Sequence, residues 1–398
     1  MSILINNARP ISPGLEPAPG LQSILIDSGR ILAIAPAIQT LIPPARTIDA
    51  RGRCVIPGFV DCHTHACFAG ERLDEWELKR RGATYLEILA RGGGIMSTVR
   101  AVRAASQSQL SDLLSQRLDR ILHAGTTTIE IKSGYGLSTA DELKMLRAID
   151  DASRAWPGTI IKTALLGHAL DPDIPDFFNH TIHRTLDAVH DEFPGIAVDV
   201  FCEKNAWPLE ESTRLLARAA GLGHPIRAHV DQFNSLGMVE RAVALNARSV
   251  DHLEASTPAQ LDAIAASWKH HPSAGTWAVG LPVCGFHVDA RYADLRGIID
   301  RGGRVALATN FNPGSAPSFS LPFAMALAVR HCGLTHDQAL AAATSNPAQL
   351  LGLPDRGTLA PGACADLLIL HHTDPRNLTF EVGVDPVQHV IARGQWIR

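Results

Sequence analysis

Eight short apolar segments of β-forming composition recur through the middle of this 398-residue chain, and helix-like stretches separate them. The segments read FVDCH, TTTIEI, TIIKTALLGH, IAVDVFCE, IRAHV, RSVDHL, TWAVGLP and RVALAT. After the first segment, Leu110, Leu114, Leu118 and Ile121 follow helical spacing. Alternating strands and helices predict a parallel sheet, and eight repeats predict an α/β fold of the (β/α)8 TIM-barrel type. An open doubly wound sheet is the alternative, although no G-x-G-x-x-G motif follows the early strands.

The two ends of the chain differ from this middle part. The first 57 residues contain short β-type runs separated by Pro and Gly, such as SILINNA, SILIDSG and RILAIAP, and the last 40 or so residues look similar. We therefore predict that residues 1–57 and 357–398 form one small β-sandwich domain, and that residues 58–356 form the barrel.

Composition narrows the functional class. The hydrophobic content is 46% and the charged content 19%, which suits a large core and is unlike a disordered chain. The net charge is −4 with Lys and Arg scattered, so we expect no nucleic-acid partner. The sequence has no apolar run of membrane-spanning length and no signal-peptide pattern, and its seven Cys follow no disulfide spacing. We expect a cytoplasmic protein with reduced thiols and no membrane partner.

Polar residues gather where the expected strands end. The first strand ends in His63-Thr64-His65, and alternate side chains of a strand share one face. Because active sites of such barrels form at the carboxyl ends of the strands, we expect the other strand ends to contribute to the same mouth. They carry Lys132, Ser133, Tyr135, His168, Glu203, His229, His252 and Asn310. A chance H-x-H in a chain with 18 His is the alternative interpretation.

The residue types suggest hydrolytic chemistry at a metal. A catalytic metal needs about three protein ligands and an open position, which His63, His65 and His229 can provide. A bound divalent ion makes water nucleophilic near neutral pH, and a neighbouring carboxylate would collect the proton. His252 can polarise a carbonyl or stabilise an oxyanion, with a purely structural hydrogen bond as the alternative.

These motifs resemble those of the amidohydrolase superfamily, which carries H-x-H on the first barrel strand, single histidines on strands five and six, and an acidic residue after strand eight. The likeness is greatest to the imidazolonepropionases, which open imidazolone propionate to formiminoglutamate in histidine degradation. The matching segments are PGFVDCHTHACFAGER, RGATYLEILARGGGIMSTVRA, TTTIEIKSGYGL, LLGHAL, FCEKNAW, RAHVDQFNSLG, VDHLEAST and NPGSAPSFSLPFAMALA. The resemblance covers nearly the whole chain in order, and it implies a metal-dependent barrel hydrolase with a β-sandwich built from both termini, assembled as a homodimer.

The resemblance also implies roles for single residues. It makes His63, His65 and His229 metal ligands, with Zn²⁺ as the expected ion and Fe or Mn as alternatives. Gln232 falls where family members carry a Gln or Glu that touches the substrate ring, so we count it with His252 as catalytic and also as substrate-binding. The pocket for the ring and the propionate tail of the substrate would contain Arg72, Tyr85, Tyr135 and His168. A guanidinium group suits a carboxylate, which agrees with the first of these.

One position departs from the family motif A-T-D-x-N-P-G, because this chain reads A-T-N-F-N-P-G with Asn310 in place of the catalytic Asp. The amide oxygen of Asn310 can still contact a metal or a water. The amide cannot accept a proton near neutral pH. Three explanations stay open: a deliberate Asp-to-Asn change, a natural member in which another group transfers the proton, and a catalytically inactive relative that binds small acids.

A second departure lies after strand seven, in LPVCGFHVDARYADLR. Family members tend to carry apolar and aromatic residues there, whereas this chain has Cys284, His287, Asp289 and Arg291. The extra polar groups suggest a differently substituted ring, such as the 3-(5-oxo-2-thioxoimidazolidin-4-yl)propionate that a related branch hydrolyses with release of sulfide in ergothioneine breakdown. A loop difference without meaning for the substrate is the alternative.

We therefore expect a metal-dependent hydrolase that opens a five-membered nitrogen ring bearing a propionate. A non-catalytic binder of the same acids is one rival interpretation, and a cofactor-free barrel with a structural histidine cluster is the other.

Overall fold

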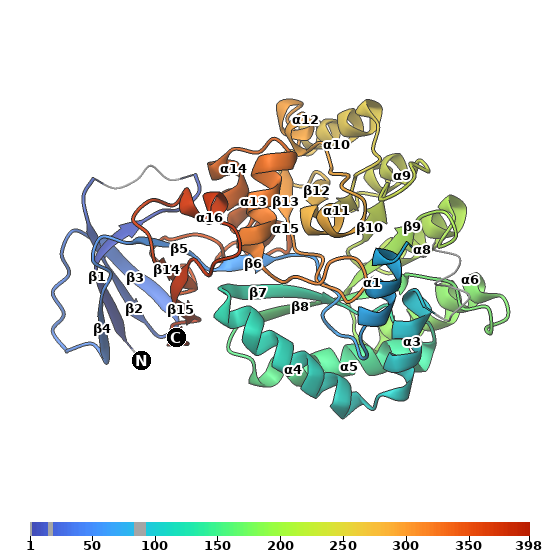
Figure 1. Cartoon of the computed structure of the whole chain (residues 1–398), viewed down its shortest axis with the longest axis horizontal. Helices are drawn as coiled ribbons and strands as arrows, with labels where there is room; N and C mark the ends of the chain where they lie inside the picture. The colour runs from blue at the N-terminus through green and yellow to red at the C-terminus, as the bar shows by residue number, and fades with distance from the viewer. Residues whose placement is uncertain (1, 15–18, 83–92) are drawn as a thin grey trace.

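The computed structural model describes residues 2–14, 19–82 and 93–398 of the chain. A curved sheet of eight parallel strands forms its centre (Figure 1), in the order β13-β12-β11-β10-β9-β8-β7-β6. The strands are β6 (Phe59–Asp61), β7 (Thr126–Lys132), β8 (Thr159–Gly167), β9 (Ala197–Cys202), β10 (Arg227–Val230), β11 (Ser249–His252), β12 (Trp277–Gly280) and β13 (Val305–Leu307). They coincide with the eight apolar segments of the sequence, so the predicted (β/α)8 barrel is confirmed.

Backbone hydrogen bonds just beyond the two end strands bring the sheet towards closure. The Asn310 N–H donates to the His63 carbonyl oxygen at 3.0 Å, and the His65 N–H donates to the Phe311 carbonyl oxygen at 2.9 Å. The segments that follow β6 and β13 therefore lie side by side. This closure brings the H-x-H motif next to Asn310.

Helices cover the outside of the sheet and account for the periodic stretches of the sequence (Figure 1). They begin at capping residues such as Ser106 and Thr335, each of which forms a capping box with the Gln three positions later. None of the described helices is long and apolar enough to cross a membrane. The helices are α1 (Leu73–Arg80), α3 (Ile95–Ala104), α4 (Gln107–His123), α5 (Thr139–Ala155), α6 (Phe177–His180), the π-helical turn η1 (Thr181–Thr185), α7 (Leu186–Glu192), α8 (Leu209–Gly221), α9 (Met238–Ala244), α10 (Pro258–His270), α11 (Pro282–Val288), α12 (Leu295–Asp300), α13 (Leu321–His331), α14 (His336–Ala342), α15 (Ser345–Leu350) and α16 (Asn377–Phe380).

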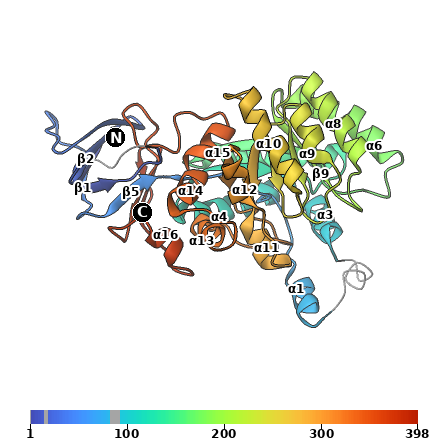
Figure 2. The same cartoon turned by 90° about the horizontal axis from the view of Figure 1, so that it is seen from above.

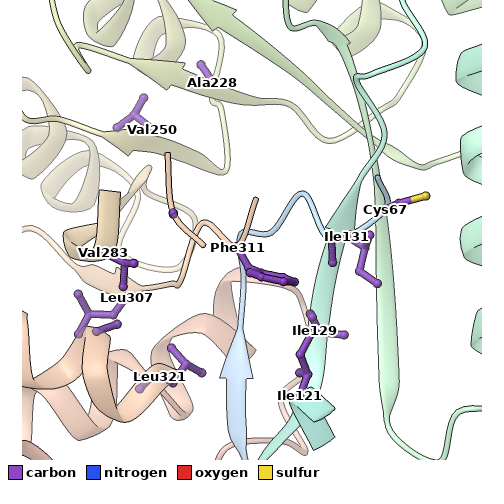
Figure 3. Close-up of a cluster of buried hydrophobic side chains, with 14 of the residues drawn as sticks. Cys67, Ile121, Ile129, Ile131, Ala228, Val250, Val283, Leu307, Phe311 and Leu321 are labelled. Carbon is purple, nitrogen blue, oxygen red and sulfur yellow. The ribbon is translucent and has the colours of Figure 1, made fainter. Parts of the chain in front are cut away.

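Strand alternation separates an apolar outer layer from a polar interior. Ile129 and Ile131 of β7 belong to the main apolar cluster, and Figure 3 shows them near Ile121 of α4. The alternate residues Glu130 and Lys132 are also buried, and they pair with charged groups rather than with the helices. The sheet thus presents charged side chains to the inside of the barrel and aliphatic ones to the helices.

Both termini build a second, mixed sheet at one end of the molecule, where the N- and C-terminal ends lie close together (Figures 1 and 2). Its strand order is β16-β15-β14-β5-β1-β2-β3, with β4 paired to β1. Apolar residues from both halves of this sheet share one buried cluster, as the sandwich expectation requires. The strands are β1 (Ile3–Pro10), β2 (Gln22–Asp27), β3 (Arg30–Ala35), β4 (Arg46–Asp49), β5 (Cys54–Pro57), β14 (Leu367–Leu370), β15 (Val387–Ala392) and β16 (Gln395–Trp396).

Strand β14 joins the two apolar cores. Leu367 and Ile369 belong to the core of the small sheet, whereas Leu368 and Leu370 belong to the core of the barrel. All four are buried, so both faces of this strand are covered. The small sheet is therefore packed directly onto the barrel by alternate residues of one strand.

We expect Leu368→Ala to lower the free energy of unfolding by about 2–5 kcal/mol, because it removes buried aliphatic surface and leaves a cavity between the sheet and the barrel. Urea unfolding followed by circular dichroism measures the change. Leu41→Ala is the matched control, since the Leu41 side chain is fully exposed and should alter stability by less than about 0.5 kcal/mol. Equal effects of the two changes would contradict the interface that we assign to β14.

Candidate active site

Three histidine rings converge at the carboxyl ends of β6 and β10. The Nε2 atoms of His63 and His65 lie 3.3 Å apart, and those of His229 and His65 also lie 3.3 Å apart. All three side chains are buried. His63 and His65 share a face because they are two residues apart in extended backbone, as the sequence predicts. The three nitrogens form a compact donor set able to hold one metal ion.

The opposite nitrogens of two of these rings bind buried carboxylates. The His63 Nδ1 lies 2.6 Å from an Asp251 carboxylate oxygen, and the His229 Nδ1 lies 3.1 Å from Asp199. Such contacts fix the ring orientation and direct the Nε2 lone pair away from the carboxylate, as is usual for metal-binding histidines. Neither aspartate was among the site residues expected from the sequence. Asp251 could have been found, because it directly precedes His252 in a strand whose alternate residues face the interior.

Two buried cations balance these carboxylates. The Lys132 ammonium donates to Glu130 and to Asp199, each at 2.8 Å. The Arg227 guanidinium donates to Asp251 at 2.8 Å. We call these five residues the buried charge network. Its members lie beneath the histidines, and each has a partner of opposite charge within the network, as buried charges require.

The electrostatic surroundings keep the histidine rings neutral. Burial first, and the nearby Lys132 ammonium second, lower the pKa of His63 well below its ordinary value. Burial and the neighbouring His168 lower the pKa of His65 in the same way. Burial also lowers the pKa of His229, although Asp199 opposes the change. Neutral imidazoles carry free lone pairs, so the donor set has the protonation state that a metal ion requires.

Asn310 follows β13 and sits beside this donor set through its backbone bond to His63. Its backbone has a left-handed conformation with φ of 55°, which asparagine and aspartate tolerate better than most residues. The Oδ1 atom of Asn310 is buried and has no hydrogen-bond partner among the described residues. A buried amide oxygen without a partner is costly, so this atom fits contact with a cation or a water.

His252 ends β11 with another left-handed backbone conformation, φ of 87°, and Leu253 follows at 75°. Its Nδ1 lies 3.2 Å from Glu254, and a ring nitrogen lies within 4.8 Å of the Cys284 sulfur. Burial disfavours the charged ring, but Glu254 and Cys284 outweigh it and raise the pKa of His252 to about 10. The ring centroids of His252 and His229 are 5.6 Å apart, so the structure brings His252 to the cluster as predicted.

Two more of the predicted pocket residues border the histidines. The His168 ring stacks on His65 with centroids 5.0 Å apart, and Tyr135 lies 5.1 Å from His168. Burial lowers the pKa of His168 to about 3. The loop that carries Tyr135 is held by the buried Glu142 carboxylate, which accepts hydrogen bonds from three of its backbone N–H groups. Glu142 was not expected from the sequence.

The remaining predicted pocket residues have mixed outcomes. Arg72 is largely engaged, because its guanidinium donates to both oxygens of Glu75, at 2.6 and 2.5 Å. The third guanidinium nitrogen faces Gly314, in the loop after β13. Arg72 therefore borders the mouth of the barrel while Glu75 holds its guanidinium in place. Tyr85 lies outside the described residues. Gln232 is buried after β10, and its Nε2 donates to the Cys284 sulfur at 3.2 Å.

Of the polar residues in the loop after β12, Cys284 is buried in α11, and its sulfur accepts a hydrogen bond from Gln232. The sulfur also lies within 4.8 Å of a ring nitrogen of His252. Arg291 instead pairs with Asp289 on the outside of the loop. The sequence drew attention to this loop but could not separate the residue that faces the site from those that do not.

Comparison with known proteins agrees with this geometry. A sequence model described as the amidohydrolase family matches residues 54–397. The chain is 44% identical to an imidazolonepropionase of Symbiobacterium thermophilum, over 93% of this chain and 88% of that protein. It is 41% identical to an imidazolonepropionase of Deinococcus deserti, over 96% of this chain and 97% of that protein. Among solved structures, the 5-methylcytosine deaminase of Klebsiella pneumoniae has the same fold, with a TM-score of 0.76 at 18% identity over 99% of this chain and 98% of that one.

We expect Asp251→Asn to weaken metal binding by roughly 10–100-fold, because the His63 ring loses the carboxylate that orients it. Dialysis against graded chelator followed by elemental analysis measures the metal retained per chain. Asp262→Asn is the matched control, since the Asp262 carboxylate is exposed and pairs only with Arg301 at the surface. Unchanged retention in Asp251→Asn would mean that other contacts hold the His63 ring.

Proposed function

The chain belongs to the amidohydrolase family and is an imidazolonepropionase-like hydrolase of cyclic amides, and we propose that it opens a five-membered nitrogen ring bearing a propionate. Imidazolone propionate, which would give formiminoglutamate, is the first candidate substrate. The observation that carries this proposal is the set of three neutral, buried His Nε2 atoms beside the unpaired Oδ1 of Asn310. The same set argues against a purely structural histidine cluster, which would not need three inward lone pairs.

In this proposal His63, His65 and His229 hold one divalent ion, with Asn310 as a further neutral donor. Zn²⁺ suits these nitrogen donors, and Fe or Mn are alternatives. Such an ion would supply Lewis-acid chemistry, polarising a carbonyl group and acidifying a water. The orienting carboxylates Asp199 and Asp251 belong to the same proposal, because they keep the rings in place.

The chain's own residues would bind the substrate and handle its charge. Gln232, Tyr135 and His168 would surround the ring, and Tyr85 would join them. The guanidinium nitrogen of Arg72 that does not contact Glu75 would meet the propionate, with Glu75 fixing the guanidinium. His252 would donate a hydrogen bond to the oxyanion that develops when water attacks the ring carbonyl. Cleavage of the bond between the carbonyl carbon and the ring nitrogen would then open the ring and leave a carboxyl group on the product.

In this proposal, Asn310 limits the rate of turnover. An amide can orient the attacking water but cannot accept its proton. A general base contributes about 10²–10⁴-fold to the rate. The family therefore places a carboxylate where this chain has Asn310, and the proton must pass to another group or the reaction must slow down.

A specific observation favours a second candidate, hydrolysis of 3-(5-oxo-2-thioxoimidazolidin-4-yl)propionate with release of sulfide. Cys284, a polar departure from the family loop, is the residue of that loop that reaches Gln232 and His252. A changed side chain beside the expected ring position suits a changed ring. The homodimer expected from the family resemblance and the cytoplasmic location expected from the sequence stay predictions.

We expect Asn310→Asp to raise kcat by about 10²–10⁴-fold on the true substrate, because it restores a proton acceptor. Rates on imidazolone propionate and on its 2-thioxo analogue, with metal content recorded, identify that substrate. Asn246→Asp is the matched control, since Asn246 has nearly the same backbone φ, 56°, but is exposed in the turn before β11, at the opposite end of that strand from His252.

Activity of the original chain that Asn310→Asp does not raise would contradict the proton-acceptor role of position 310. Binding of both rings without turnover by either protein would instead identify a non-catalytic binder of small acids.

A further inference from the structure

Cys284 lies where two pocket residues meet. It belongs to α11, directly after β12, and its side chain is 2% exposed. The Gln232 Nε2 donates a hydrogen bond to its sulfur at 3.2 Å. Cys284, His252 and Glu254 place one polar atom each within 4.8 Å of one another. The thiol is therefore part of a polar cluster and not a simple apolar filler.

The cluster is incompletely satisfied on its inner side. The second carboxylate oxygen of Glu254 is buried and has no hydrogen-bond partner among the described residues. Among the described residues, the Nε2 of Gln232 donates to Cys284 and no hydrogen bond reaches its Oε1. An unpaired buried acceptor such as the Glu254 oxygen indicates a place that a donor from a ligand would complete.

The backbone holds Cys284 rigidly in this position. A Cβ atom on the neighbouring Gly285 would lie 2.0 Å from the Arg291 carbonyl oxygen, so α11 packs tightly against the loop that follows it. Cys284 itself joins a buried apolar cluster with Leu281 and Ala308. A side chain held this firmly can impose an orientation on a more mobile partner.

A glutamine side chain has two different ends, a carbonyl oxygen that accepts and an amino group that donates. Sulfur accepts the Gln232 amino group, so the carbonyl oxygen is the end left for a ligand. We propose that Cys284 is a positioning residue that sets the orientation of the Gln232 amide, so that the pocket selects rings presenting an N–H donor to it. This inference rests on the proposed function, because it requires Gln232 to face the ring of the substrate.

The consequence is a selectivity that depends on Cys284. A ring nitrogen that carries a hydrogen would meet the Oε1 of Gln232, whereas a methylated nitrogen would leave this oxygen unpaired. Without the sulfur, the amide can turn its amino group toward the ligand, and the preference disappears. Serine keeps a hydroxyl that can accept the same hydrogen bond, so it should preserve the orientation.

The test compares Cys284→Ala and Cys284→Ser with the parent chain, using titration calorimetry with imidazolone propionate and its two ring N-methyl analogues. The Asn310 chain suits binding measurements because its turnover is expected to be slow, and kcat/KM in the Asn310→Asp background gives a second readout. We expect the parent to prefer the unmethylated ring over at least one analogue. Cys284→Ala should reduce this preference roughly tenfold, the size of one lost hydrogen bond, and Cys284→Ser should retain most of it.

A double-mutant cycle with Gln232→Ala separates positioning from packing. If Cys284 acts through Gln232, adding Cys284→Ala to Gln232→Ala should change the preference no further. Cys54→Ala is the matched control, since Cys54 is a fully buried thiol in β5 of the small sheet. It should leave the preference unchanged even if it lowers the melting temperature as much as Cys284→Ala does.

The outcomes are distinguishable. A parent chain that neither binds nor hydrolyses any of the three rings overturns the proposed function, and the inference with it. A parent that discriminates, combined with a Cys284→Ala variant of equal preference, overturns the inference alone. An effect of Cys284→Ala that persists in the Gln232→Ala background also overturns it, because the sulfur would then act on the ligand directly or through packing.

Discussion

The charges buried inside the barrel are the constraint on which the rest of the site depends. Lys132 and Arg227 are enclosed together with Glu130, Asp199 and Asp251, and each charge has a partner of opposite sign. Removing one partner from such a network typically costs about 3–5 kcal/mol, because the other charge stays buried and unpaired. Replacing a buried ionic set by apolar residues is often tolerated for stability. We therefore infer that the buried charge network serves to orient two histidine rings.

The same segments that close the barrel also carry the chemistry. Asp61, His63 and His65 share one face of an extended segment, and the backbone of His63 bonds the backbone of Asn310 on the other side of the seam. Asp61 in turn accepts a hydrogen bond from the Thr309 hydroxyl at 2.5 Å. The contacts that close the sheet thus also bring the donor set together. Left-handed backbone at the ends of β10, β11 and β13 then directs side chains towards the mouth, at a conformational cost that is common in functional sites.

The sequence predicted most of this arrangement, for reasons that can be named. The alternation of apolar and helical segments is a local signal, so the eight strands and the composite second sheet could be foreseen. The histidines could be foreseen because strand ends meet at one mouth whatever the details of packing. Of the carboxylates that orient those histidines, Asp251 could have been inferred from its place before His252, whereas Asp199 lies within a strand and only its neighbour across the sheet reveals its role.

Two other features needed three-dimensional contacts. Arg72 was expected to meet the substrate carboxylate, and the structure adds that Glu75, one helical turn along, engages two of its three guanidinium nitrogens. Cys284 was noticed only as one polar residue of a loop. Its contact with Gln232 depends on α11, whose position depends on the close approach of Gly285 to Arg291. Contacts of this kind are set by backbone packing between distant segments, which no periodicity in a sequence encodes.

The residue type at position 310 affects the chemistry of the site but not the fold of the chain. Asparagine and aspartate have nearly the same shape, and both tolerate the left-handed backbone found there. The backbone bond from Asn310 to His63 uses no side-chain atom, so closure of the barrel does not depend on which of the two is present. The side chains differ in charge and in the ability to take up a proton. An amide at this site therefore preserves the barrel seam and the three-histidine donor set but supplies no proton acceptor there, so the fold of this chain and proton transfer at position 310 are determined independently.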